Sequence, residues 1–487
     1  MRRTRAREKG FVWIFTAMTM IIIVPMIGLA IDASILYIVK AKLQGAVDGA
    51  ALAGARALAR GANGAAQIAS AQTAAQAYVK LNIPDGYLLS TNLVVSVPTV
   101  DLSVAFQRKV SVTANVDSPA LFMRYVGVNL STVNAVAQAV RRDVNIVMVV
   151  DRSGSLTASG SCAAVRAAAV NFVSKFSNLR DNLGLVTFAS TTFVNFPVAN
   201  NFKTAVPDVS TMINGIVCQG STSSAMALWQ GYDQLVGLNQ PGALNIILFF
   251  TDGQPTGVAF NMPIATASPC TAWSPYVPAA SAPPGAVGYI TGLYNTFANA
   301  NQFFGMLNQQ GTAVGGIQTI INGDIERPPS WTGCAFASPW SVNGTVPASA
   351  LVKTDFVGVP TTDIFGNSAD TAYQLVTHSG ALIDIGDDTN APKMALNAAD
   401  DAARRIRIGT TDPVYSRGIN NITIFSIGLG NALIPASPVF LERVSNDVRS
   451  PIYDSTKPEG LYVAAPTSAD IDSAFSVIAS EILRLAR

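Results

Sequence analysis

The sequence of 487 residues is poor in the residues on which many catalytic sites depend. It contains one histidine, His378, so a His-rich zinc site is impossible and any Ser-His or Cys-His mechanism would have to use that residue. The motifs GxxxxGK[ST], HExxH and GxSxG are absent as well. These absences favour a binding protein over an enzyme.

Charge is also scarce. Only 13% of the residues are charged and the net charge is +2, so there is no basic field to attract nucleic acid. Hydrophobic residues make up 49% of the chain, which argues against disorder. The length is sufficient for two or three domains with a sizeable core.

The four cysteines form no CxxC motif; they are Cys162, Cys218, Cys270 and Cys334. An even number in an exported chain favours two disulfides, and three pairings are possible. The alternative is four buried free thiols.

The run from Phe11 to Ile31 carries no charge and is long enough to span a hydrocarbon core of ~30 Å as a helix. Five basic residues precede it: Arg2, Arg3, Arg5, Arg7 and Lys9. Because positive residues stay in the cytoplasm, the chain after Ile31 is expected outside the membrane. A permanent anchor is our interpretation. Cleavage after Gly28-Leu29-Ala30 by a signal peptidase, or at Gly10-Phe11 by a prepilin peptidase, remains an alternative.

After the apolar run, Asp32 to Arg60 is alanine-rich and predicts a helical stalk. Its small residues between Leu43 and Ala53 suit close helix packing, either on the chain's own domain or on other subunits. The basic start, the apolar helix ending at Asp32 and the Leu43–Ala53 run resemble the N-terminus of TadE/TadG-like proteins of Tad/Flp pilus assembly. This resemblance, over residues 1–60, implies a single-pass protein of the bacterial inner membrane with its C-terminal domain in the periplasm or cell exterior.

Residues 61–142 predict a small α+β spacer. Gln67 to Leu81 favours a helix, whereas Leu93 to Val97 and Val110 to Val116 show strand patterns. Ala120 to Val126 and Val133 to Val140 complete this region, and none of it indicates chemistry.

Residues 143–487 predict a doubly wound, mostly parallel α/β sheet of Rossmann-like type. The expected strands are Val144–Val150, Leu183–Phe188, Asn245–Phe250 and Asn421–Gly428, and the expected helices include Ala163–Phe176 and Ile471–Leu485. Ligands in such folds bind beyond the carboxyl ends of the strands.

Two carboxylates, Asp151 and Asp252, fall at those strand ends. Ser153 and Ser155 alternate in the loop after Asp151, so both hydroxyls can turn toward the same point. Oxygen-only ligands suit a divalent cation, with Mg²⁺ preferred and Ca²⁺ or Mn²⁺ as alternatives.

Three segments carry a second resemblance: Asp151-Arg152-Ser153-Gly154-Ser155, Gly220-Ser221-Thr222 and Thr251-Asp252-Gly253. In this order they are similar to the metal-ion-dependent adhesion site of von Willebrand factor A domains. The resemblance implies that Ser153, Ser155 and Thr222 bind the ion, with Asp151 and Asp252 binding it directly or through water. It also leaves one position open for an acidic group of a partner.

The second resemblance also bears on the disulfides. It places Cys162 just after the first metal loop and Cys218 just before the Thr222 loop, which favours the pairs Cys162–Cys218 and Cys270–Cys334.

Compared with that family, the chain has a long insertion at about residues 254–390, followed by the expected family helix at Ala391–Ile408. A helix is predicted at Ile290–Gln309, and a disulfide between Cys270 and Cys334 would staple the segment. The insertion leaves the sheet beside the predicted cation, so it either shapes access to the ion or decorates the surface.

Together these features predict an envelope-anchored, cation-dependent binding protein of a Tad/Flp-type pilus or tight-adherence system. Its partners would be a protein that offers a carboxylate and other pilus or secretion subunits, with the membrane contacted through Phe11–Ile31. The alternative is an accessory A-domain protein of a membrane-associated ATPase or chaperone complex.

Overall fold

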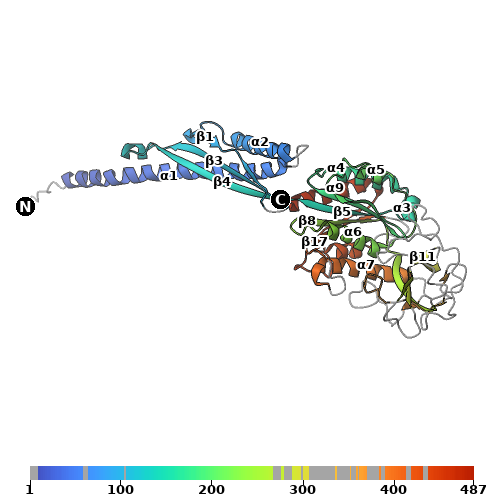
Figure 1. Cartoon of the computed structure of the whole chain (residues 1–487). Coiled ribbons are helices and arrows are strands. Elements are labelled where there is room, and N and C mark those ends of the chain that lie inside the picture. The colour runs from blue at the N-terminus through green and yellow to red at the C-terminus, as the bar shows by residue number, and fades with distance from the viewer. Residues whose placement is uncertain are drawn as a thin grey trace, which may run out of the picture. The chain divides into compact units, whose positions relative to one another are not determined.

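The chain folds as two compact units, residues 1–142 and 143–486 (Figure 1). The computed structural model describes residues 9–58, 64–103, 106–266, 276–278, 288–297, 300–305, 335–336, 351–352, 358–359, 361–369, 383–384, 390–412, 418–430 and 437–486. The predicted helix at Ile290–Gln309 lies partly, and His378, Cys270 and Cys334 lie wholly, outside these residues.

The first unit begins with helix α1, Lys9–Ala57, which continues through Pro25 and past Asp32 without a break. Its apolar part meets the length and composition required to cross a membrane, and it is the one such helix among the described residues. Side chains along this part, such as Ile21 and Met26, are exposed. The predicted apolar helix and its helical continuation are therefore both present in α1.

The first unit also contains an antiparallel sheet, whose long central strand is β3, Gln107–Pro119. Strand β4, Leu130–Arg142, pairs with β3 along its whole length. Strands β1, Thr91–Val95, and β2, Thr99–Asp101, pair with successive parts of β3. The unit is completed by helix α2, Gly64–Asn82, and by short turns η1, Tyr87–Leu89, and η2, Met123–Val126.

The C-terminal half of α1 packs on this sheet. Its buried positions Val39, Leu43 and Val47 recur at helical spacing and share one core with α2 and β3. Gly49 permits the close approach of α2, because a Cβ there would lie 2.4 Å from the Tyr78 ring. Of the two alternatives for the alanine-rich stretch, packing on the chain's own domain is the one seen on this face.

The second unit is built on a six-stranded sheet in the order β18-β17-β8-β5-β6-β7. All neighbouring strands are parallel except β6 and β7, which are antiparallel. The strands are β5 Val144–Asp151, β6 Asn182–Phe188, β7 Thr192–Ala199, β8 Leu244–Thr251, β17 Ile422–Leu429 and β18 Tyr462–Ala465. Every residue of β5, β8 and β17 is buried, as their apolar, β-branched sequences predict.

Helices cover both faces of this sheet (Figure 1). One face carries α4 Cys162–Ser174, α5 Val209–Asn214 and α9 Ile471–Leu485, and the other carries α6 Ser224–Leu238, α7 Asn390–Ile408 and α8 Pro438–Ser445. The short elements are α3 Gly154–Ala158, η4 Gly409–Thr411 and η5 Ser468–Asp470. This is the doubly wound arrangement expected from the sequence.

The inserted region begins with β9, Gly257–Thr266, which pairs with β11, Gly288–Phe297. Strand β12, Ala300–Gly305, pairs with the opposite edge of β11, over 292–297. The predicted helix at Ile290–Gln309 is therefore wrong where the structure describes it. Tyr, Ile, Thr and Phe residues of β11 suit a pleated strand, and pairing with β9 overrides the helical pattern. The remaining strands are β10 Tyr276–Pro278, β13 Ala335–Phe336, β14 Leu351–Val352, β15 Gly358–Val359 and β16 Ile383–Asp384.

Two stretches of the insertion, one around Val258 and one around Phe365, enter the main core. Val258 and Phe260 of β9 are buried against α6 and α7, and Phe365 stacks on Trp229 of α6 at 6.0 Å between ring centroids. Arg405 of α7 donates to the Phe365 carbonyl at 2.8 Å. These stretches are part of the core, so surface decoration does not describe them.

Candidate metal centre

The two aspartates of the predicted site lie at the carboxyl ends of neighbouring parallel strands. Asp151 is the last residue of β5, and Asp252 directly follows β8. The two strands are paired up to Val150 and Phe250, so their ends meet at one edge of the sheet. Both carboxylates are fully buried.

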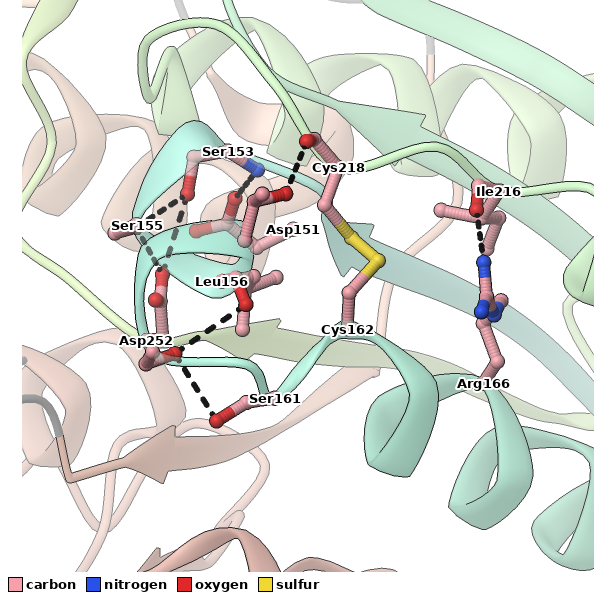
Figure 2. Close-up of a disulfide and its surroundings, with 12 residues drawn as sticks. Asp151, Ser153, Ser155, Leu156, Ser161, Cys162, Arg166, Ile216, Cys218 and Asp252 are labelled. Carbon is pink, nitrogen blue, oxygen red and sulfur yellow. Dashed lines mark hydrogen bonds between the residues drawn. A yellow bond between two sulfur atoms is a disulfide. The ribbon is translucent and has the colours of Figure 1, made fainter.

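The loop after Asp151 folds back over that edge (Figure 2). The Ser153 N–H donates to Asp151 Oδ1 at 2.7 Å, which fixes the turn, and the hydroxyls of Ser153 and Ser155 lie 2.9 Å apart. Both hydroxyls reach the same carboxylate oxygen, Asp252 Oδ1, at 3.2 Å and 2.9 Å. Four of the five predicted ligands therefore form one hydrogen-bonded group.

The electrostatics of this group are unusual for aspartates. Burial raises the pKa of Asp151 to about 7, and the nearby charge of Asp252 is the second cause. Hydrogen bonds from Thr251 and Ser153 oppose this rise. Thr251 Oγ1 donates to Asp151 Oδ2 at 2.6 Å and so fixes the other side of the carboxylate. Two buried carboxylates that repel each other form an arrangement that a divalent cation would relieve.

Thr222, the fifth predicted ligand, reaches this edge on a separate loop. Gly154 N–H donates to the Gly220 carbonyl at 2.9 Å, and Gln219 N–H donates to the Arg152 carbonyl at 2.7 Å. Gly220 has φ of 93°, a left-handed value that glycine adopts without strain. Thr222 itself is 5% exposed, and its backbone is held on both sides by Thr256.

Thr256 and Ser190 hold this loop in place but were not singled out from the sequence. The Thr222 N–H donates to Thr256 Oγ1 at 3.0 Å, and the Thr256 N–H donates to the Thr222 carbonyl at 2.8 Å. Ser190 Oγ accepts from the Ser221 N–H at 3.0 Å. These contacts join residues that are 31 to 34 positions apart, and no local motif marks them.

A disulfide secures the same loop. Cys162, at the start of α4, is bonded to Cys218, with the two Cα atoms 6.1 Å apart (Figure 2). Arg166 of α4 adds a hydrogen bond of 2.8 Å to the Ile216 carbonyl. The predicted Cys162–Cys218 pair is confirmed, whereas Cys270–Cys334 falls outside the described residues.

The donor set fits a hard cation. It offers carboxylate and hydroxyl oxygens, which suit Mg²⁺, Ca²⁺ or Mn²⁺ and not a soft metal. In the part of the chain that the structure describes, no cluster of three or more His, Cys, Asp or Glu side chains is placed to hold a metal. Any cation here would thus depend on two aspartates supplemented by hydroxyls.

Comparisons with known proteins place both parts of the chain. Residues 145–269 match the von Willebrand factor type A domain, and residues 10–57 match the TadE/G-like region of Flp pilus assembly. The chain therefore combines a TadE/G-like N-terminus with a von Willebrand factor A domain, as the sequence resemblances implied. Its apolar helix and TadE/G-like region indicate a single-pass membrane protein. No curated protein matches the chain.

Several solved structures are distantly similar. The pilus adhesin SpaC from Lactobacillus rhamnosus GG is 14% identical, with a TM-score of 0.35, over 81% of this chain and 34% of SpaC. The vWF domain of the type V pili tip protein Mfa5 from Porphyromonas gingivalis is 13% identical, with a TM-score of 0.36, over 72% of this chain and 98% of that one. A von Willebrand factor type A protein from Catenulispora acidiphila is 9% identical, with a TM-score of 0.32, over 80% and 50%. The chain thus spans about a third of SpaC, and TM-scores this low define neither function nor ligand.

Proposed function

We propose that this chain is a membrane-anchored binding protein that uses a divalent cation, held by Asp151, Ser153, Ser155, Thr222 and Asp252, to capture an acidic group of a partner. The observation that carries the proposal is the convergence of two fully buried carboxylates and two serine hydroxyls at one strand edge. Mg²⁺ is the preferred ion, with Ca²⁺ or Mn²⁺ as alternatives.

Each residue has a distinct part in this proposal. Thr251 and the Ser153 N–H orient the two oxygens of Asp151, so that the carboxylate does not rotate. Ser153 and Ser155 direct their hydroxyl oxygens to the same point beside Asp252, and Thr222 completes the set from the loop held by the disulfide. When bound, the cation supplies a positive centre that accepts a carboxylate oxygen from outside.

Binding is favoured over catalysis. Both carboxylates of the site would be occupied as ligands of the cation. Among the described residues, no third His, Cys, Asp or Glu side chain joins them to serve as a general base. We therefore propose that the chain is not an enzyme. Domains of the matched A type are commonly non-catalytic and commonly bind a divalent cation at this position.

The N-terminal region supports a place in a Tad/Flp-type pilus or tight-adherence system. We propose inner-membrane anchorage through α1, with the A domain in the periplasm or at the cell exterior. A disulfide in the A domain fits that side of the membrane, because the cytosol keeps thiols reduced. The domain division that we propose is 1–60 for the anchor and stalk, 61–142 for the spacer and 143–487 for the A domain with its insertion at about 254–390.

The insertion is placed to influence what the site binds. The N–H groups of Thr256 and Gly257, at its start, donate to the Thr222 carbonyl at 2.8 Å and 3.1 Å. Movement of β9 would therefore be transmitted to one of the proposed ligands. We propose that the insertion shapes access to the cation.

A capture experiment tests the proposal. The full chain in lipid nanodiscs is immobilised and incubated with envelope extract in Mg²⁺, in EDTA, and as Asp151→Ala in Mg²⁺. Asp208→Asn serves as a matched control, because this half-buried acid lies outside the proposed ligand set, caps α5, and asparagine also caps well. We expect a specific partner in Mg²⁺ with the wild type and the control only. Equal recovery in EDTA and from Asp151→Ala would refute cation-dependent capture.

A further inference from the structure

The tip of the β3–β4 hairpin, residues 120–130, is tied to α1 at the point where the apolar run ends. Asp32 immediately follows that run and is 3% exposed. Its carboxylate accepts from the N–H groups of Leu121, Phe122 and Met123 at 2.9, 3.0 and 2.8 Å. Three N–H donors compensate a buried carboxylate for the loss of its water. This contact therefore fixes the hairpin tip beside the end of the apolar run of α1.

The turn that joins β3 to β4 runs beside α1, at the end of the hairpin nearer the N-terminus of that helix (Figure 1). Phe122 packs directly on Gly28, where an added Cβ would lie 2.7 Å from the Phe122 Cβ and Cγ atoms. Gly28 belongs to the apolar run Phe11–Ile31. A side chain of the hairpin therefore lies at the same level along the helix as residues that the membrane is expected to surround.

The outer surface of the hairpin tip has the composition of a membrane interface. Four apolar or aromatic side chains are exposed: Tyr125 by 77%, Leu130 by 53%, Phe122 by 40% and Val128 by 39%. The Arg124 guanidinium lies 5.0 Å from the centre of the Tyr125 ring. Tyrosine with a neighbouring arginine is enriched where hydrocarbon meets lipid headgroups.

The backbone of the hairpin tip is suited to the same environment. Tyr125 N–H donates to the Phe122 carbonyl at 3.1 Å, and Val128 N–H donates to the Met123 carbonyl at 3.1 Å. Ala120 N–H bonds to the Asn129 carbonyl at 3.1 Å. Main-chain polar groups that enter a bilayer interface need such internal partners.

We propose that the hairpin tip is a second membrane-contacting element, which enters the headgroup and upper acyl region of the outer leaflet beside α1. This inference rests on the proposed membrane span of α1. Lipid is the occupant because the tip contacts α1 at Gly28 and Asp32, and the residues that precede these two in the apolar run, Ile27 and Ile31, are exposed. The contact would set the depth and rotation of α1 and hold the first unit against the membrane.

Site-specific photo-crosslinking tests this inference. The full chain is made with p-benzoyl-phenylalanine at position 125, reconstituted in nanodiscs, irradiated and analysed for lipid adducts by mass spectrometry. Position 22, in the apolar run, is the positive control. Position 97 is the matched control, because Val97 is exposed by 65% in the same unit. It lies between β1, which pairs with 114–117 of β3, and β2, which pairs with 109–111, so it flanks the middle of β3 and not the tip. These side chains are exposed, so the replacements do not disturb a core.

We expect lipid adducts at positions 22 and 125, with a yield at 125 several-fold above that at 97. Adducts at 22 without adducts at 125 would overturn the hairpin contact and leave the anchor intact. Equal yields at 125 and 97 would overturn it as well, because contact would not be specific to the tip. An absence of adducts at both 22 and 125 would remove the membrane span and the hairpin contact together.

Discussion

Asp32 in the first unit and Asp151 with Asp252 in the second are all buried carboxylates, but their surroundings differ in kind. Asp32 accepts three backbone N–H groups from a single turn. Asp151 faces a second carboxylate, and its pKa is raised to about 7 by burial and by that neighbour. The first arrangement is completed by the protein itself, whereas the second is suited to completion by a cation. Burial of a carboxylate alone therefore does not indicate a cation site; the number of hydrogen-bond donors around it must be considered as well.

The largest effect is expected from the loss of the Asp32 carboxylate. In Asp32→Ala, the N–H groups of residues 121–123 lose their acceptor, so we expect their hydrogen-exchange protection to fall on the order of 100-fold. Hydrogen exchange followed by mass spectrometry in nanodiscs measures this change. Asp48→Ala is the control, since Asp48 is exposed on the same helix and accepts only from Gln44. Unchanged protection in Asp32→Ala would show that the carboxylate does not hold the hairpin tip.

The opposite result is expected at the second site. In Asp151→Asn the repulsion with Asp252 disappears, so the metal-free protein should be at least as stable as the wild type. Added Mg²⁺ or Mn²⁺ should stabilise the wild type by about 2.7 kcal/mol at 100 times its dissociation constant, and should leave Asp151→Asn unshifted. Thermal unfolding with and without the cation measures both effects. An equal shift in the variant would place the cation elsewhere.

The unfolding free energy of the metal-free protein should also depend on pH. Well below pH 3.8, Asp151 is protonated in both the folded and the unfolded state. As the pH rises, the unfolded state ionises near 3.8 and the folded state only near 7. The metal-free protein should therefore lose roughly 4 kcal/mol of unfolding free energy between these values, most of it above pH 5. Denaturant unfolding at pH 5 and pH 7.5 in EDTA measures the loss.

A cation favours the ionised carboxylates, so its own stabilising effect should grow over the same pH window. Asp151→Asn should flatten the metal-free profile. A wild-type profile that is already flat would contradict the raised pKa.

The smallest effect is expected from a single hydroxyl. Ser155→Ala removes one proposed ligand and one hydrogen bond to Asp252, so cation affinity should fall roughly tenfold, or about 1.4 kcal/mol. Calorimetric titration with Mn²⁺ provides the measurement. Ser159→Ala is the control, because Ser159 is exposed near the same loop and its hydroxyl bonds to the Leu156 carbonyl and to Ser161 Oγ. Identical affinities for Ser155→Ala and the wild type would remove Ser155 from the ligand set.

Much of the second unit could be predicted because its signals are local. Continuous β-branched runs identified β5, β8 and β17, and the position of each aspartate after a run placed both at one edge. The disulfide followed from the resemblance of the two loops that flank it. Asp151, Ser153, Ser155 and Asp252 converge accordingly, although cation binding itself stays a prediction.

What the sequence did not reveal depends on distant pairing. The helix predicted at Ile290–Gln309 overlaps β11, whose partner β9 is separate in sequence, so that its pairing leaves no local mark. Asp32 was noted only as the end of an apolar run, although it bonds to residues 89 to 91 positions later. Contacts of this kind arise from tertiary packing, which a pattern in one segment does not encode.

Ala259, near the start of the insertion, meets Ile364, in its later part, inside the fold, where the Ile364 N–H donates to the Ala259 carbonyl at 3.0 Å. The chain between these two residues therefore leaves the core of the second unit and returns to it at almost the same point. The entropy of closing such an excursion grows only with the logarithm of its length. Changes in the length or sequence of the chain between Ala259 and Ile364 would leave the strands that carry Asp151 and Asp252 unchanged, so the same proposed cation site could serve many different partners.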